Sequence, residues 1–265
     1  TTTQLRSLSA TGFAALTTTQ IAALSTTQIS VLTSTEVGGM TSSQMAALSV
    51  DQLDALSMTQ MAYMSTSGLS GLTASQVSTL DTSQLAVLAE DQIAALSDQA
   101  VSGLTTTQLN ALEDWQFTSL SATGVGGMSA TQISSLTTTQ VALLSTTEIS
   151  GLSPIQVVLS SLDAEDLRAI TVTQLAGLVR MQLRALSSEQ LQSLTVTQIS
   201  SLSGTQVSSL TATELTSLTA TQFATLSSTQ VGALTATQLG ALTATQLGSL
   251  SATQLSGLTT TTVAA

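Results

Sequence analysis

The sequence predicts an all-α solenoid, a superhelix of very short helices, and three observations lead to this class. An eight-residue unit recurs from one end of the chain to the other. Most units carry Ser or Thr first and Gln or Glu three residues later, a pattern typical of the capping box that begins a helix. Each unit also carries two apolar residues, at its fifth and eighth positions, which can be buried only if neighbouring units stack.

The segment around Pro154 shows the expected helix start most openly. Ser153 can act as N-cap, and Pro154 then takes the first helical position, where its missing N–H costs nothing. Gln156 stands three residues after the cap and completes the capping box. Leu152 and Val157 flank this start and can pair as a hydrophobic staple. We expect a helix to begin in the same way in every unit.

The units run in phase with one interruption. The consensus is [Ser/Thr]-x-[Ser/Thr]-[Gln/Glu]-apolar-x-x-[Leu/Met], and about 20 units fill residues 1–157. Two extra residues then shift the phase within 158–162, and about 13 further units fill residues 163–265. We expect the insertion to break the regular geometry, with Leu159 and Leu162 sharing the place of one eighth-position Leu. We interpret the chain as a processed product or a segment of a longer array.

A β-solenoid is the alternative fold, because Thr-rich sequence favours strands. Against it, the apolar positions alternate in steps of three and five residues, which would place them on opposite faces of a strand. A continuous helix also fails, because eight residues at about 100° each rotate the apolar stripe by about 80° per unit. Short helices remain, and they are unstable unless they stack. Ala and Gly at the sixth and seventh positions would allow close packing.

The composition excludes several classes of protein. The 265 residues include no Cys and no His. Four Arg and fifteen Asp and Glu give a net charge of −11. Such a surface repels nucleic acid. No apolar run reaches the length of about eighteen residues that a membrane span needs. The first residues contain neither an initiator Met nor a signal peptide.

We expect no enzymatic activity, no cofactor and no metal site. A Ser or Thr nucleophile needs a nearby base, usually His or Lys, and the chain has neither. The densest acidic group, Asp163, Glu165 and Asp166, is typical of a helix cap with a charged first turn beside Arg168. No loop with alternating ligands and a turn glycine is present for calcium.

Three of the four arginines, Arg168, Arg180 and Arg184, follow the phase slip closely. They could receive an anionic partner, but pairing with the neighbouring carboxylates is the favoured interpretation.

The aromatic residues are scattered singly and form no stacking platform. Phe13, Phe117 and Phe223 occupy the fifth position and are expected in the core. Trp115 occupies the third position, which faces solvent, and can mark a local contact. Tyr63 belongs to neither group.

A binding module is the alternative function. Threonines repeat at the first and third positions, as in Thr17-Thr18-Thr19, and a regular array of this kind could bind ice or a glycan. In the helical interpretation, however, capping uses the first hydroxyl of each unit.

The octads from Leu16 to Ile29 resemble the Thr/Ser/Gln-rich octapeptide-repeat arrays of large bacterial exoproteins and adhesins. The resemblance covers the whole chain and carries no functional motif. It implies secretion and a structural or adhesive role. We therefore expect an extracellular or cell-surface protein that forms a filament or adhesin stalk. Its expected partners are other copies of itself, the cell surface or glycans, and not nucleic acid.

Overall fold

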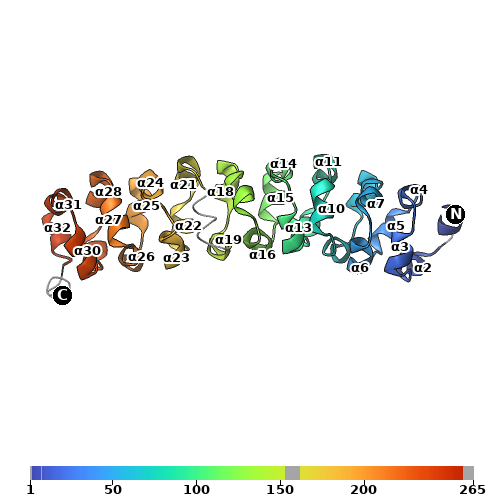
Figure 1. Ribbon diagram of the computed structural model, residues 1–265, viewed down its shortest axis with the longest axis horizontal. Coiled ribbons are helices and arrows are strands. Elements are labelled where there is room, and N and C mark those ends of the chain that lie inside the picture. Colours follow the sequence, from blue (N-terminus) through green and yellow to red (C-terminus); the bar gives the residue numbers. More distant parts are fainter. Residues whose placement is uncertain (1, 7, 153–161, 259–265) are drawn as a thin grey trace. The chain divides into compact units, whose positions relative to one another are not determined.

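The structure is a computed structural model, and it describes residues 2–6, 8–152 and 162–258 (Figure 1). Within these ranges every regular element is a short α-helix and no strand occurs. The predicted all-α solenoid is confirmed, and the β-solenoid alternative is wrong. None of the described helices is long and apolar enough to cross a membrane.

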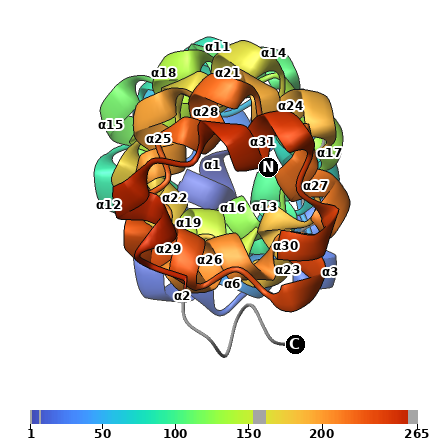
Figure 2. The same cartoon turned by 90° about the vertical axis from the view of Figure 1, so that its left-hand side faces the viewer.

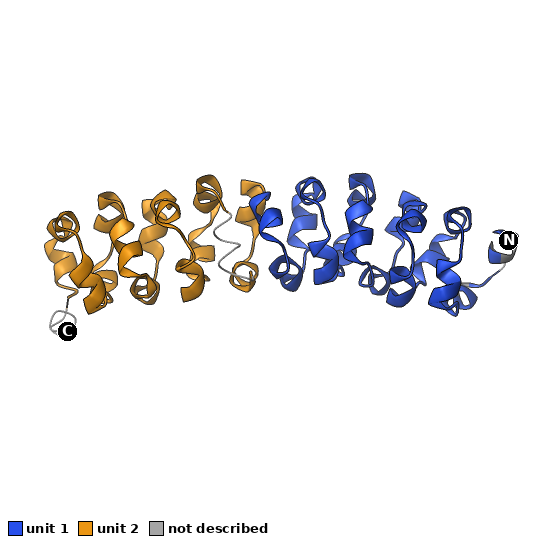
Figure 3. Cartoon of the chain, in the orientation of Figure 1, with its two compact units in different colours: residues 1–136 blue, residues 137–265 orange. Residues whose placement is uncertain are grey.

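The chain divides into two compact units, Thr1–Leu136 and Thr137–Ala265 (Figure 3). The phase slip at 158–162 falls inside the second unit. The helices of the first unit are four to six residues long. They are α1 (Thr2–Arg6), α2 (Ala10–Ala14), α3 (Thr18–Ala22), α4 (Thr26–Ser30), α5 (Ser34–Gly38), α6 (Ser42–Ala46), α7 (Val50–Asp54), α8 (Met58–Ala62), α9 (Thr66–Leu69), α10 (Ala74–Thr79), α11 (Thr82–Ala86), α12 (Glu90–Ala94), α13 (Asp98–Ser102), α14 (Thr106–Ala111), α15 (Asp114–Thr118), α16 (Ala122–Gly126) and α17 (Ala130–Ser134).

The described helices of the second unit are equally short, and more of them reach six residues. They are α18 (Thr138–Leu143), α19 (Thr146–Gly151), α21 (Ala164–Ala169), α22 (Val172–Ala176), α23 (Arg180–Leu183), α24 (Ser188–Ser193), α25 (Val196–Ser201), α26 (Gly204–Ser209), α27 (Ala212–Ser217), α28 (Ala220–Ala224), α29 (Ser228–Gly232), α30 (Ala236–Ala241), α31 (Ala244–Ser249) and α32 (Ala252–Leu255).

Helix α7 shows how one unit is made. Ser49 adopts an extended conformation, and its hydroxyl accepts the N–H of Gln52 at 3.1 Å. In return, the Ser49 N–H donates to Oε1 of Gln52 at 2.7 Å, which completes the predicted capping box. The helix closes when the Leu56 N–H bonds to the Leu53 carbonyl at 3.1 Å. Four orphan N–H groups cannot be satisfied within so short a helix, so the cap residues take over this role.

The fifth- and eighth-position side chains form the core, as the pattern predicts. Phe13, Phe117 and Phe223 are among the most deeply buried side chains. Leu8, Leu247 and Leu255 are exposed, and other such leucines in the first and last turns are only half-buried, because fewer helices cover them: Leu16, Leu24, Leu239, Leu250 and Leu258. Burying a Leu or Ile side chain contributes roughly 1.5–3 kcal/mol, so the pair in each unit drives stacking.

Successive helices wind into a superhelix within each unit. Each helix packs beside the helix three places later, as α7 does against α10 and α21 against α24. Many helices also meet the end of the helix four places earlier through a Gln side chain, as described next. One turn therefore takes between three and four helices. In Figure 2 the orange and red helices of the second unit lie in this way around a ring.

The Gln at the fourth position has a second role that the sequence pattern does not reveal. Gln52 Nε2 donates to the carbonyl oxygens of Ile21 at 3.1 Å and Leu24 at 2.6 Å, both at the end of the helix four places earlier. The same bonds recur in both units, for example from Gln108 and Gln238. Such an amide caps its own helix N-terminus through oxygen and the C-terminus of an earlier helix through nitrogen.

The expected break in geometry concerns residues 158–161, which lie outside the described residues, as do Leu159 and the helix start at Ser153. Helices that precede this segment pack against helices that follow it, α18 against α21 and α19 against α22. Gln174 still reaches the Val141 carbonyl, at 2.9 Å, although the separation along the chain is two residues longer than elsewhere. Leu162 is buried and its carbonyl accepts from Gln190 Nε2, so it fills an eighth position.

Candidate functional site

A shallow seam recurs along each unit, where the start of one helix faces the end of the helix three places later. Gly71 shows how closely the two approach, because a Cβ added there would clash with the Ser42 backbone. Gly103 would meet Ala74 in the same way. The seam is a fixed product of stacking, whereas the side chains that line it differ from turn to turn. Several grooves open along it, and we describe three that have charged side chains in their lining.

The first groove lies between α12 and α15 and encloses about 620 Å³. We name it the acidic groove, and its lining is Ala89, Glu90, Asp91, Ala94, Thr118 and Ser119. Both carboxylates are exposed, and in the described ranges neither forms an ion pair. Trp115 stands on the wall helix α15 with 47% of its surface exposed. Its carbonyl accepts the Ser119 hydroxyl at 2.6 Å, which ties the tryptophan backbone to the groove.

The second groove lies between α23 and α26 and encloses about 530 Å³. We name it the basic groove, and its lining includes Leu178, Val179, Arg180, Thr205, Gln206 and Ser209. Val179 is 47% exposed and Met181, on the same wall helix, is 60% exposed. Arg180 and the exposed Arg184 flank Met181, and no ion pair holds either guanidinium within the described part of the chain.

Both grooves begin with a helix that breaks the capping rule. Ala89 precedes α12 and Val179 precedes α23, and neither side chain can accept a hydrogen bond. Only the amide half of the capping box remains, from Ala89 to Gln92 at 2.8 Å and from Val179 to Gln182 at 2.9 Å. In α23 a cation, Arg180, also occupies the first turn, where the helix dipole disfavours positive charge. The missing side-chain cap is expected to cost each of these helices about 1 kcal/mol.

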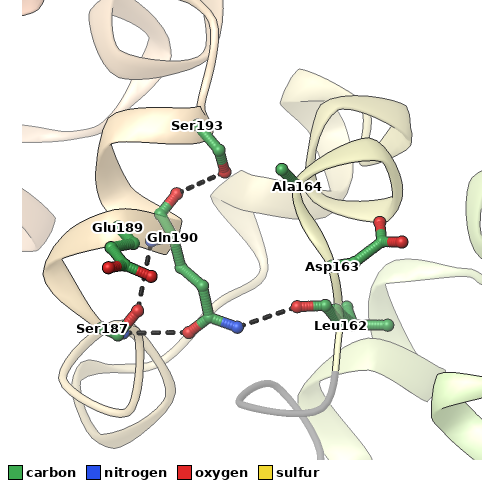
Figure 4. A pocket seen from close by; sticks show the side chains of 7 residues that line it. All are labelled: Leu162, Asp163, Ala164, Ser187, Glu189, Gln190 and Ser193. Carbon is green, nitrogen blue, oxygen red and sulfur yellow. Dashed lines mark hydrogen bonds between the residues drawn. The ribbon is translucent and has the colours of Figure 1, made fainter.

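The third groove lies between α21 and α24 and encloses about 340 Å³ (Figure 4). Figure 4 shows Gln190 spanning it, with its Nε2 bonded to the Leu162 carbonyl at 2.9 Å. Its Oε1 accepts the Ser187 N–H at 2.9 Å, and its backbone carbonyl accepts the Ser193 hydroxyl at 2.7 Å. Because the fold itself uses these polar atoms, few of them remain available to bind a ligand in this groove.

The acidic group predicted from the sequence lies at the edge of this third groove. Asp163 Oδ1 accepts the N–H groups of Glu165 at 2.8 Å and Asp166 at 2.9 Å, as expected for a helix cap. Burial raises the pKa of the Asp166 carboxyl above its ordinary value. The N–H of Asp163 opposes this rise in pKa, while the Asp163 and Glu165 carboxylates add to it.

The three arginines do not form the ion pairs that the sequence suggests. Arg168 donates its Nε to the Ser193 carbonyl at 3.1 Å and so joins α21 to α24. Arg180 lines the basic groove, and Arg184 is the C-cap residue of its wall helix α23. Across the ranges that the structure describes, no carboxylate pairs with any of the three. The two arginines of α23 therefore keep their charges available to solvent.

Many hydroxyl groups of the described residues take part in the hydrogen bonds of the fold itself. First-position hydroxyls accept a helix N–H, as Ser49 does, and many seventh-position hydroxyls bond the preceding helical carbonyl, as Ser209 does to Gln206 at 2.6 Å. Among the described residues, no three Asp or Glu side chains are placed to hold a metal ion.

Sequence reasoning identified Trp115 and the arginines singly but missed both grooves. The signal was present, because Val179-Arg180-Met181 is a unit start without Ser or Thr at its first or third position. The sequence does not show that stacking brings residues three units apart together along the seam.

Comparison with known proteins bears on the N-terminal part of the chain. The profile of the ALTTAQ repeat family matches residues 1–26 and 21–50. This similarity supports a repeat-array protein, in agreement with the stacked octads. No curated protein matches the chain.

Proposed function

We propose that the chain is a structural protein without enzymatic activity, which serves as an extracellular filament or adhesin stalk on a bacterial surface. The main support for this proposal is the repeated hydrogen bond from a fourth-position Gln to the helix four places earlier, which we call the glutamine ladder. The same buried amide joins helices four places apart through turn after turn of both units. Length and stiffness then scale with the number of units, and the fold needs no unique residue.

Three further features support the proposal. The chain contains neither His nor Lys as a base for its many hydroxyl groups. Its octads resemble the repeat arrays of bacterial exoproteins, which implies secretion. Its first-position hydroxyls are used in capping, which leaves ice or glycan binding with only the second and third positions of each unit. The binding-module alternative therefore has weaker support.

The test is a scan of deletions along the chain. Removing the whole octad Thr243–Leu250 should be tolerated, because Gln254 then meets the carbonyls one unit earlier and finds the same environment. Removing only Thr243–Gln246 should be far worse, because Leu247 then stands where a cap belongs.

The readouts are solubility, the circular dichroism spectrum, particle length by electron microscopy and attachment to a bacterial surface. Particle length should shorten by the same step wherever the octad is removed. A single octad whose loss abolishes attachment, while all other deletions are neutral, would replace the structural proposal with a discrete binding site.

A further inference from the structure

We propose that the acidic groove of one copy of this chain binds the basic groove of another copy. This inference rests on the proposed structural function and names its partner, which is the chain itself. It starts from the unequal distribution of charge. Residues 1–136 contain nine Asp and Glu and one Arg, whereas residues 137–265 contain six Asp and Glu and three Arg.

The two grooves are complementary in charge. The acidic groove presents Glu90 and Asp91, and the basic groove presents Arg180, with Arg184 on the same wall. All four side chains are exposed, and within the described ranges none has an ion-pair partner. An Arg guanidinium pairs with a carboxylate through two parallel hydrogen bonds, which gives such a contact direction as well as charge.

The two grooves are also complementary in apolar surface. Beside the lining of each groove, a wall helix carries a large exposed side chain, Trp115 on α15 at the acidic groove and Met181 on α23 at the basic groove. Both stand at the third position of their units, which Thr or Ser fills in most others. A thioether packs favourably against an aromatic ring, and Val179 adds apolar area beside Met181. Tryptophan and arginine are the residues that most often dominate protein interfaces.

The contact joins different surfaces of identical chains, so it is heterologous. A bound pair therefore keeps one basic groove free on one copy and one acidic groove free on the other, and association can continue into an open chain of molecules. This gives the proposed filament a means of assembly that does not depend on how the ends of the array are built.

The experiment uses the full 265-residue chain and two charge-reversal variants, R180E/R184E and E90R/D91R. Analytical ultracentrifugation over a range of concentrations and salt measures self-association. The unmodified chain should associate, and added salt should weaken this association because exposed charges are screened. Each variant alone should sediment as a monomer, because both of its grooves then carry the same sign.

An equimolar mixture of the two variants should associate again, since each reversed groove meets the opposite charge on the other variant. The control D51R/D54R changes the charge of the first unit equally at exposed positions on α7 and should associate normally. W115A and M181A should each weaken association without changing the circular dichroism spectrum.

Persistent association of both reversal variants, failure of their mixture to associate, or a monomeric unmodified chain would overturn the inference. None of these outcomes would by itself contradict the structural function. The octad-deletion scan tests that function separately, through particle length and attachment.

Discussion

The acidic and basic grooves occupy the same seam of the same repeat, yet they carry opposite charges and different large side chains. Both depend on a buried Gln, Gln92 in one and Gln182 in the other, and on the same core positions. In the units that begin at Ala89 and Val179 the fourth position is Gln, the eighth is Leu and the fifth is apolar, whereas the first, second, third and sixth positions differ in character. The comparison teaches that the fourth, fifth and eighth positions specify the fold, whereas the others are free to carry surface chemistry.

The largest expected effect is on the free energy of unfolding, from changes at the core positions that the two grooves share. Ile93 and Leu183 are the fifth-position residues of their wall helices, and both are fully buried. I93A and L183A should each lower the free energy of unfolding by about 2–5 kcal/mol, because each leaves a cavity in the core. M181A, on the exposed face of the same helix as Leu183, should change it by less than about 0.5 kcal/mol. Urea titration followed by circular dichroism measures all three.

Equal losses from I93A and L183A would show that the two grooves share one architecture. A loss from M181A as large as that from L183A would contradict the assignment of inside and outside positions.

The next effect concerns the glutamine ladder. Gln92 Nε2 bonds the Met64 carbonyl at 2.7 Å, and Gln182 Nε2 bonds the Ile149 carbonyl at 2.7 Å. Q92A or Q182A removes both the cap acceptor and the bridge to the earlier helix. Each buried group left without a partner costs roughly 1–3 kcal/mol. The loss should exceed that in other units, because Ala89 and Val179 offer no side-chain cap.

Q20A is the matched control, because exposed Gln20 makes the capping box with Thr17 but has no described bond to an earlier helix. It should cost about 0.5–1.5 kcal/mol, the net contribution of one ordinary hydrogen bond. If Q20A and Q92A lower the denaturation midpoint equally, the bridge to the earlier helix contributes nothing.

Much of this architecture could be predicted from the sequence, and the reason is local. Capping boxes, apolar spacing and small residues act within one unit, so Ser49, Gln52 and Leu53 could be placed correctly from their neighbours. The bond from Gln52 to Leu24 could not, because it depends on the number of units per superhelical turn. That number follows from how whole side chains pack, which an eight-residue pattern does not encode. The grooves were missed for the same reason.

A smaller effect tests why the two grooves lack caps. A89S and V179S restore a hydroxyl acceptor at the start of α12 and α23, and each should stabilise the chain by about 1 kcal/mol. V179S should also weaken self-association, because it removes exposed apolar surface from the basic groove. A89S changes little apolar area and should leave association nearly unchanged. Thermal melting and ultracentrifugation of the same samples give both quantities. If V179S stabilises the chain without affecting association, Val179 is no part of the interface.

The smallest effect sets the third groove apart from the other two, because its edge contains a carboxylate with a perturbed pKa. Burial raises the pKa of Asp166, so the folded chain holds its proton at a pH where the unfolded chain has released it. The contribution of protonated Asp166 to the free energy of unfolding is therefore complete below about pH 4, the ordinary pKa of an Asp carboxyl. It is lost as the pH rises through the higher pKa that Asp166 has in the folded chain. D166N removes the charge and keeps an oxygen that can accept the Asp163 N–H, the bond that spans 3.3 Å in the structure.

D166N should therefore be more stable than the unmodified chain at neutral pH and equally stable in acid. E189Q, a change at an exposed carboxylate of the same groove, is the control and should show no comparable dependence. Urea midpoints measured from acid to neutral pH give the comparison directly. A D166N variant that is less stable at neutral pH would mean that the Asp166 carboxylate is held by favourable contacts, and that the third groove binds charge as the other two do.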